Sequence, residues 1–377
     1  MIKLIKPFFL PFSLLYGLIV FFRNQLFDYK IFKSKEFHLP VISVGNITVG
    51  GTGKTPHTEY LIHLLKDNYN IAYLSRGYKR KTRDFIVATD NSSAEVIGDE
   101  PYQIKHKFPE LIVAVDRDRV NGIQKLMENV PDLDVVLLDD AYQHRSVSPG
   151  VNILLIDYNK PIKEDFLLPY GRLREPASQK KRADIIIVTK VPGNISAMDK
   201  RLFLMNIAAK SHQTVYFTTI AYGDLQPVFD PSLKIGFDSS QQATPLTQMK
   251  DSDIKKTDYR ILLVTGIANP SLLINELTTH YKEVIPMSFA DHYAFKKTDI
   301  NSIIEKYNSI AGNLKMIVTT EKDAARLQTF NFPESNPDAW YYIPIEIQFF
   351  ANDAEHFNQQ ILHYVNNNSR NSILYKK

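Results

Sequence analysis

The chain has 377 residues, of which 44% are apolar, and its formal net charge is +4. This length accommodates two domains of ordinary size with real hydrophobic cores, and the mild charge gives no reason to expect a nucleic-acid partner. The sequence contains no cysteine, which excludes disulfides, iron–sulfur clusters and zinc sites built from thiolates.

The N-terminal segment is apolar and lies between basic residues. Residues 8–22 read FFLPFSLLYGLIVFF. The flanking cations are Lys3, Lys6, Arg23, Lys30, Lys33 and Lys35. The segment is shorter than the roughly 20 residues of a membrane-spanning helix, and no small-residue signal-peptide cleavage site follows it. We therefore expect a helix that lies in the surface of an anionic membrane; a helix packed on the domain core and a true membrane span are the alternatives.

A glycine-rich loop between a strand and a helix is the most informative motif. Residues 41–44 form a short apolar strand, GNITVGGTGKTP follows, and Pro56 suits the first turn of a helix. In a phosphate-binding loop the glycines let backbone N–H groups turn toward an anion, a lysine contacts the β and γ phosphates, and a hydroxyl binds Mg²⁺. The predicted nucleotide-binding residues are Thr48, Val49, Gly50, Gly51, Thr52, Gly53, Lys54 and Thr55. The usual spacing has glycine at position 48, and a glycine turn beside a surface lysine is the alternative.

Charged residues follow the next predicted strand, residues 71–75. Five cations come shortly after it, at Arg76, Lys79, Arg80, Lys81 and Arg83. They could receive an anionic substrate or form a solvated loop. Further on, residues 98–101 read Gly-Asp-Glu-Pro and place Asp99 and Glu100 in a loop or at a helix start. Either carboxylate could bind magnesium or act as a base, although a capping role fits equally well.

Two aspartates end a later strand. Residues 135–138 are strongly apolar and run into Asp139 and Asp140. In NTPases an acid in this place faces the phosphate loop and holds the metal; an aspartate that caps a helix is the alternative. Residues 185–189 form another buried strand, and Lys190 follows it without the aspartate that guanine-specific enzymes carry two residues later. That difference favours ATP over GTP.

Alternating strands and helices predict an α/β fold, with a mostly parallel, P-loop NTPase-like sheet flanked by helices. We expect an apolar N-terminal helix in residues 1–35, a P-loop domain in 36–225, a hairpin and linker in 226–258, and a smaller α/β domain in 259–370. The hairpin strands are expected at residues 215–221 and 227–229. His292 follows Asp291 in the smaller domain, where such a pair is more often a surface histidine than a catalyst.

Together, these motifs resemble the tetraacyldisaccharide 4′-kinases, the lipid A kinases of Gram-negative bacteria. The segments that carry the resemblance are residues 45–56, 98–101, 139–145, 173–176, 291–295 and 320–324, in family order. The family usually reads Asp-Asp-Gly-Phe-Gln-His-Arg, so Ala141 and Tyr142 depart from it while both acids are retained. Residues 230–258 and those after 330 match no family motif.

The resemblance implies an enzyme with a larger N-terminal domain, a smaller C-terminal domain and an active site in the cleft between them. The implied reaction moves the γ-phosphate of ATP to the 4′-hydroxyl of a tetraacylated glucosamine disaccharide 1-phosphate, with Mg²⁺ as the cofactor. The implied location is the cytoplasmic face of the inner membrane, where an anionic surface is the second partner, and we expect a monomer.

The resemblance also implies roles for single residues. Asp99 would accept the proton of the acceptor hydroxyl, His292 would orient Asp99, and Lys54 would neutralise phosphate charge. The residues expected at the magnesium are Thr55, Glu100, Asp139 and Asp140, and Arg174 and Glu175 are expected on the nucleotide side.

Two other classes of protein share part of this pattern. A P-loop ATPase that switches a protein partner at the membrane would hydrolyse ATP without regard to lipid and would not need His292. A membrane-tethering protein that binds nucleotide only structurally would keep its function after Lys54→Ala.

Overall fold

The computed structural model describes residues 6–78, 80, 82–229, 256–267, 269–291, 293–328, 330 and 339–375. The chain divides into two compact units, the first made of Met1–Ala221 with Glu346–Lys377 and the second of Tyr222–Ile345. This division differs from the expected one, because the end of the predicted smaller domain returns to the first unit. The physical reason lies in helix α11 (Asp353–Tyr375), whose Phe357, Ile361 and Val365 are buried in the core of the first unit.

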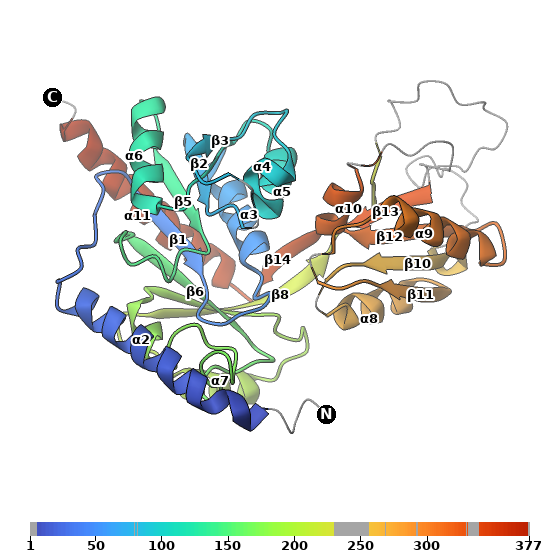
Figure 1. Ribbon diagram of the computed structural model, residues 1–377, viewed down its shortest axis with the longest axis horizontal. Helices are drawn as coiled ribbons and strands as arrows, with labels where there is room; N and C mark the ends of the chain where they lie inside the picture. The colour runs from blue at the N-terminus through green and yellow to red at the C-terminus, as the bar shows by residue number, and fades with distance from the viewer. Residues whose placement is uncertain are drawn as a thin grey trace. The chain divides into compact units, whose positions relative to one another are not determined.

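The first unit is built on one nine-stranded sheet (Figure 1). Its strand order is β14 (Ile345–Phe349), β8 (Thr214–Tyr222), β7 (Ile185–Thr189), β6 (Val151–Asp157), β1 (Val41–Gly45), β5 (Val135–Asp139), β2 (Ile71–Ser75), β4 (Ile112–Val115) and β3 (Ile86–Val87). The pairings from β4 across to β8 are parallel, whereas β3 is antiparallel to its neighbour β4. At the other edge β14 runs antiparallel to β8, with Gly223 donating to the Pro344 carbonyl and Phe350 to the Phe217 carbonyl. The predicted mostly parallel sheet is confirmed. Val44 pairs with Asp139, so the end of β1 and the end of β5 lie at the same edge of the sheet.

Helices cover both faces of this sheet, and its central strands β1, β2, β5, β6 and β7 are accordingly buried along their whole length. On one face lie α3 (Lys54–Leu65), α5 (Asp99–Lys107) and α11, which share a core with the β1 side chains Ile42 and Val44. On the other face α6 (Arg119–Asn129) and α7 (Ala197–Ile207) pack over two further clusters. The short helix α4 (Ala94–Ile97) precedes α5 directly.

The N-terminal helix α2 (Leu10–Asp28) buries two polar residues and leaves most of its apolar side chains exposed. A short 3-10 turn, Lys6–Phe9, precedes it. Its buried residues are Ser13, Val20 and Asn24, and a side chain at Gly17 would meet Leu167 at 2.8 Å. The exposed apolar residues of the helix include Phe12, Leu14, Leu15, Leu18, Ile19, Phe21 and Phe22. This pattern does not support the alternative of a core helix. By length and composition, its 19 residues with mean hydropathy 1.3 could also cross a membrane.

The second unit has a five-stranded sheet of its own. The order is β11 (Glu283–Ser288), β10 (Arg260–Thr265), β12 (Lys315–Thr320), β13 (Trp340–Ile343) and β9 (Gln226–Pro227), and all pairs are parallel except β13 with β9. Its helices are α8 (Ser271–His280), α9 (Lys297–Ser309) and α10 (Glu321–Leu327).

The predicted hairpin between residues 215–221 and 227–229 is wrong. Strand β8 pairs with β7 in the first sheet, whereas β9 pairs with β13 in the second. A short turn therefore connects two sheets instead of two strands of one sheet. Residues 230–255 of the predicted linker lie outside the described residues, and Lys256–Asp258 form a 3-10 turn.

Candidate active site

The glycine-rich loop leaves β1 at Gly45 and enters α3 at Lys54, as predicted. Two of its residues have left-handed backbone angles, Gly50 with φ +103° and Gly53 with φ +89°, which glycine adopts without steric cost. His57 fastens the start of the helix, with Nδ1 at 2.7 Å from the Gly53 carbonyl and Nε2 at 3.0 Å from the Thr218 hydroxyl. Burial lowers the pKa of His57 to about 4. The ring is therefore neutral near pH 7, and it donates to Gly53 and accepts from Thr218.

Neighbouring strands turn the loop carbonyls outward. The Thr189 hydroxyl donates to the Thr52 carbonyl at 2.9 Å, and the Lys190 ammonium donates to the Gly51 carbonyl. Lys190 also pairs with Asp157 at 3.0 Å, which fixes its ammonium. In a planar trans peptide the N–H points opposite to the carbonyl. These contacts therefore direct the N–H groups of Thr52 and Gly53 into the loop, where they can meet an anion.

The early part of the loop pairs with a distant segment. Val49 donates its N–H to the Arg172 carbonyl at 2.8 Å, and Arg174 donates to the Ile47 carbonyl at 2.8 Å, with Thr48 opposite Leu173. The Val49 N–H is thus occupied, so the expectation that it holds phosphate is wrong for this structure. The same pairing accounts for Thr48 at the usual glycine position, because an extended strand tolerates a β-branched residue.

Asp140 lies beside the lysine of the loop. Its Oδ1 is 3.6 Å from Lys54 Nζ, and its Oδ2 accepts from Arg174 at 3.0 Å. Burial alone would raise the pKa of Asp140, but the cations Lys54 and Arg174 lower it below its ordinary value. The residue has φ +47°, a conformation that is uncommon outside glycine. This strain is held by the two ion pairs, and such strain concentrates at functional sites.

Asp139 is buried one residue earlier, at the end of β5. Its Oδ2 accepts from the Tyr73 hydroxyl at 2.8 Å, while Oδ1 has no hydrogen-bond partner among the described residues. Burial raises the pKa of Asp139 to about 6, against the opposing charge of Lys54, and Asp140 and Glu100 raise it further. A buried carboxylate oxygen without a partner is costly unless a cation or donor satisfies it.

The two carboxylates of the Gly-Asp-Glu-Pro motif occupy the first turn of α5. Gly98 before them has φ +96°, and a side chain there would meet the Gly77 backbone at 3.0 Å. This close approach brings the start of α5 to the loop after β2, at the same sheet edge as the acids. Asp99 and Glu100 are half-buried, and the charge of Glu100 acts on the pKa of Asp139.

Arg174 and Glu175 differ in their surroundings. Arg174 bridges Asp140 and the Gln143 side chain, to which it donates at 3.3 Å. Glu175 is 0% exposed; it pairs with Arg182, and it lies 3.8 Å from Arg23 of α2. The prediction that Glu175 lines the nucleotide side is therefore not supported, because its ion pairs hold it beneath the surface. Arg174, which is only half-buried beside Asp140, is still expected to line the nucleotide side.

Several contributing residues were not predicted. Tyr73 holds Asp139, Gln143 donates to the Asn46 carbonyl at 2.7 Å, and Lys190 holds the glycine loop. Arg119 is fully buried and donates to the carbonyls of Asp116 and Asp139, at 2.8 and 3.3 Å. Burial lowers the pKa of Arg119 to about 10 against the opposing charge of Asp139. For Gln143 and Lys190 the available signal was their position shortly after a predicted strand, whereas Tyr73 lies within one.

The acids fit a magnesium ion that is shared with phosphates. Within the described residues no three histidines, cysteines or acids converge as a ready metal site. Mg²⁺ nevertheless uses one or two carboxylates together with substrate phosphates and water. The unpartnered Oδ1 of Asp139 and the hydroxyl of Thr55, in the first turn of α3, are ligands of the right chemistry.

Parts of two predicted features fall outside the residues that the structure describes. His292 lies outside the described residues, and so do Lys79 and Lys81 of the basic loop. Arg80 of that loop donates to the carbonyls of Asp84 and Arg83, at 2.8 and 3.2 Å, so part of the loop's charge shapes the loop itself.

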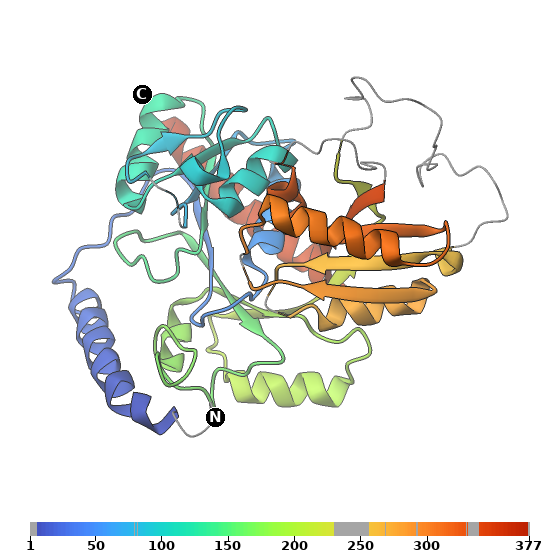
Figure 2. The same ribbon diagram turned by 45° about the vertical axis from the view of Figure 1, so that its right-hand side comes forward.

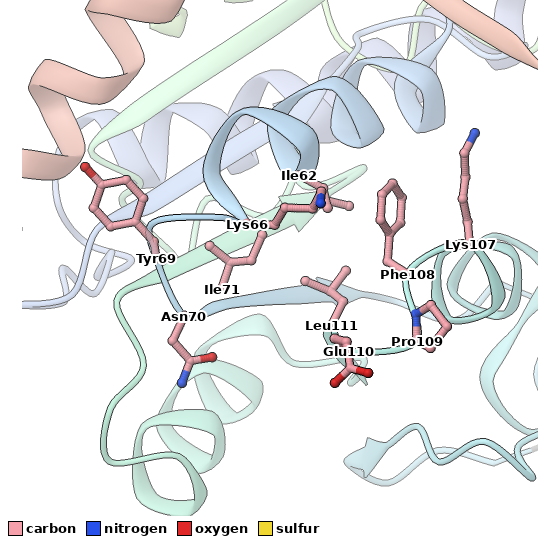
Figure 3. A pocket seen from close by; sticks show the side chains of 10 residues that line it. All are labelled: Ile62, Lys66, Tyr69, Asn70, Ile71, Lys107, Phe108, Pro109, Glu110 and Leu111. Atoms are coloured by element: carbon pink, nitrogen blue, oxygen red, sulfur yellow. The ribbon is translucent and has the colours of Figure 1, made fainter.

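A hollow of about 270 Å³ opens elsewhere in the first unit. Figure 3 shows its apolar wall of Ile62, Phe108 and Leu111 with Lys66 and Lys107 at the rim. It lies at the end of α3 and the start of β2. Ligands of parallel sheets bind at the carboxyl ends of the strands, so this hollow is not part of the candidate site.

Comparison with known proteins adds an independent finding. The Tetraacyldisaccharide-1-P 4′-kinase family profile matches residues 5–366. The tetraacyldisaccharide 4′-kinase of Bacteroides thetaiotaomicron is 47% identical over 96% of this chain and 94% of that protein. The enzyme of the same name from Flavobacterium johnsoniae is 41% identical over 97% and 99%. A crystal structure of LpxK from Aquifex aeolicus in complex with ATP has TM-score 0.68 and 28% identity, covering 96% of this chain and 99% of that one.

Proposed function

This chain belongs to the tetraacyldisaccharide-1-P 4′-kinase family, and we propose that its site transfers the γ-phosphate of ATP to the 4′-hydroxyl of a tetraacyldisaccharide 1-phosphate. The protein is a kinase of lipid A biosynthesis. The observation that carries the proposal is the meeting of the glycine loop, Lys54 and the pair Asp139–Asp140 at one edge of the sheet. The alternative of a protein-directed ATPase switch is not favoured, because the matched relatives are lipid kinases.

The loop would bind the triphosphate with backbone and side-chain charge. The N–H groups of Thr52 and Gly53 would meet the phosphates, whereas that of Val49 donates to the Arg172 carbonyl. Lys54 neutralises charge between the β and γ phosphates, and Arg174 adds a second cation from the neighbouring segment. Such sites act mainly by positioning and by neutralising charge, because the phosphoryl group itself needs little covalent help.

Magnesium would be held by Thr55 and by one or both of Asp139 and Asp140, with Glu100 beside them. When bound, it neutralises phosphate charge and orients the transferred group. Tyr73 keeps the Asp139 carboxylate oriented, with one oxygen committed to the tyrosine and the other open. Lys54 and Arg174 keep Asp140 ionised at neutral pH.

The acceptor hydroxyl needs a group that takes its proton. We assign this role to Asp99, which is half-buried at the N-terminus of α5; a pairing of Asp99 with His292 rests on the family resemblance alone. The oxygen of the 4′-hydroxyl forms a bond to the γ-phosphorus, the bond from that phosphorus to the β–γ bridging oxygen breaks, and ADP leaves. The hydroxyl proton goes to Asp99.

The direct test measures transfer of ³²P from ATP to a tetraacyldisaccharide 1-phosphate in mixed detergent micelles, with and without Mg²⁺. We expect labelled lipid that depends on both the acceptor and the metal ion. ATP hydrolysis without labelled lipid, at a rate indifferent to the acceptor, would support the ATPase switch instead.

Lys190 is expected to affect nucleotide binding although it does not contact the transferred phosphate. In Lys190→Met the Gly51 carbonyl loses its charged donor, so the loop amides are less well oriented. We expect the KM for ATP to rise about tenfold, in the range of a lost charge-assisted hydrogen bond, with little change in the KM for the lipid. Lys160→Met, at an exposed position nearby, is the matched control. Equal ATP affinity in both variants would contradict the positioning role.

The exposed apolar side of α2 supports a location at the anionic surface of the inner membrane, on its cytoplasmic face where ATP is present. The opposite side of the helix holds the site: Tyr16 donates to the Arg174 carbonyl at 2.8 Å, and Arg23 donates to the Gln143 carbonyl at 2.6 Å. Deletion of α2 would therefore disturb both membrane binding and the active site. Substitutions on its exposed side test membrane binding alone.

We expect Leu14→Gln with Leu18→Gln to lower vesicle binding on the order of tenfold, because two exposed leucines no longer leave water. Flotation with vesicles that contain phosphatidylglycerol measures this, and the micelle assay checks that phosphate transfer is retained. Unchanged flotation would remove the proposed role of α2 in membrane binding.

A further inference from the structure

Helix α7 is apolar on two opposite sides. Phe203 and Ile207 pack into a cluster on the sheet, where Phe203 stacks on Tyr158 with ring centroids 5.1 Å apart. Met198, Leu202 and Met205 recur at helical spacing and, at 3.6 residues per turn, lie on the side away from that cluster. They are 63%, 46% and 68% exposed. A surface helix of a soluble domain normally carries polar residues on this side, so the exposed stripe needs an explanation.

A basic cluster adjoins the end of the helix. Lys210 donates its N–H to the Gln213 side chain at 3.0 Å, and Gln213 donates to the Lys180 carbonyl at 2.7 Å. Burial lowers the pKa of Lys180, and the like charges of Lys163 and Lys210 lower it further, so the three ammonium groups are near enough to repel one another. In the described part of the chain none of these three lysines pairs with a carboxylate. Grouped cations beside an apolar stripe suit an anionic surface.

Helix α7 lies on the same side of the first unit as α2 (Figures 1 and 2). Ser13 of α2 donates to the Leu167 carbonyl at 2.7 Å, and Leu167 packs against the same cluster as Phe203. Phe166, the residue before Leu167, is 55% exposed. Figures 1 and 2 both draw α2 and α7 along the lower side of the first unit. This side of the first unit therefore carries two helices with exposed apolar residues, α2 and α7, together with the exposed Phe166.

We propose that α7 is a second membrane contact. Met198, Leu202 and Met205 enter the boundary between headgroups and acyl chains, while Lys163, Lys180 and Lys210 face anionic headgroups. The proposal deepens the proposed function, since a lipid acceptor requires the enzyme to sit at a bilayer. A stripe of three side chains over about two helical turns binds a membrane surface weakly alone, and α2 would supply the rest of the affinity.

A unique fluorescent label reports the position of the stripe directly. Because the chain has no cysteine, Met205→Cys gives a single site for an environment-sensitive dye in the full chain with α2 intact. With vesicles of 30% phosphatidylglycerol we expect a blue shift of the dye and quenching by spin-labelled lipids. Met127→Cys, at a 38% exposed position on α6, is the matched control and should keep a water-like spectrum. Protein that floats with vesicles while the dye at position 205 stays in water would overturn the proposal.

Substitutions measure the contribution to binding. We expect Met198→Gln, Leu202→Gln and Met205→Gln together to lower partitioning on the order of tenfold, because their apolar area no longer leaves water, with Met127→Gln as control.

Lys163→Gln, Lys180→Gln and Lys210→Gln together should weaken binding to phosphatidylglycerol vesicles but not to neutral ones. If the triple glutamine variant of the stripe partitions as wild type does, the stripe does not contact the membrane. That result would overturn the proposal and favour a protein partner. Absence of kinase activity in wild-type micelle assays would instead refute the proposed function, and the dye measurement does not depend on it.

Discussion

Lys54→Ala is expected to lower phosphate transfer about a thousandfold, which is the range for removal of one charged or donor group aimed at developing charge. Lys54 starts α3, and its ammonium lies 3.6 Å from Asp140. Without it, the β and γ phosphates would face two aspartates with less positive charge between them. The ³²P micelle assay at saturating ATP measures the loss, and filter binding of ATP separates affinity from turnover.

The fold of this variant should survive. Asp140 keeps its ion pair with Arg174, and the side chain of Lys54 contributes nothing to the buried clusters. Lys66→Ala is the matched control, because Lys66 follows the same helix and is 43% exposed; its activity should equal wild type. A well-folded Lys54→Ala protein with near-normal transfer would contradict the phosphate-loop assignment altogether.

Asp99→Asn is expected to lower kcat between about a hundredfold and ten thousandfold, the usual contribution of a general base. Asparagine keeps the size of the side chain and its place at the start of α5 but cannot accept the proton. Because Asp99 is not assigned to nucleotide binding, the affinity for ATP should change little. Single-turnover transfer and equilibrium ATP binding measure the two quantities separately.

Glu95→Gln provides the control for the loss of one carboxylate in the same region, since Glu95 is exposed on α4. It should leave both quantities unchanged. If Asp99→Asn still phosphorylates the lipid at a near-normal rate, the proton acceptor is another group. If it loses ATP affinity together with kcat, Asp99 acts on the nucleotide or the metal instead.

The sequence predicts those site residues whose positions follow from the local pattern and from the geometry of a parallel sheet. Alternating strands and helices imply a parallel sheet, and in a parallel sheet strand ends gather at one edge. Residues that follow strands, such as Lys54 after β1 and Asp140 after β5, therefore meet, as the distance of 3.6 Å confirms. Parallel direction places both strand ends at one edge, and the two residues meet because β1 and β5 are also neighbours in the sheet.

Contacts between distant segments were not predictable in this way. The hydrogen bond from Val49 to Arg172 and the burial of Glu175 against Arg182 depend on how a long loop folds back. Sequence spacing says nothing about that path. Likewise, the apolar run at residues 8–22 indicated a helix, but only the structure shows that Ser13 and Asn24 are its packed side. The Ser13 hydroxyl, for example, donates to the Leu167 carbonyl, a contact between segments that are 154 positions apart.

The insertion of the second unit has a consequence for biosynthesis. Tyr60 of α3 packs on Phe349 and Phe357, with ring centroids 5.1 and 5.9 Å apart, and both phenylalanines come after the second unit in the chain. A ribosome that has finished the second unit has not yet made β14 or α11. The nascent first unit therefore keeps this aromatic surface uncovered while the second unit is made, and nascent chains with exposed apolar surface are prone to aggregate. Chaperone capture during translation is thus expected to concentrate on the earlier-made part of the protein.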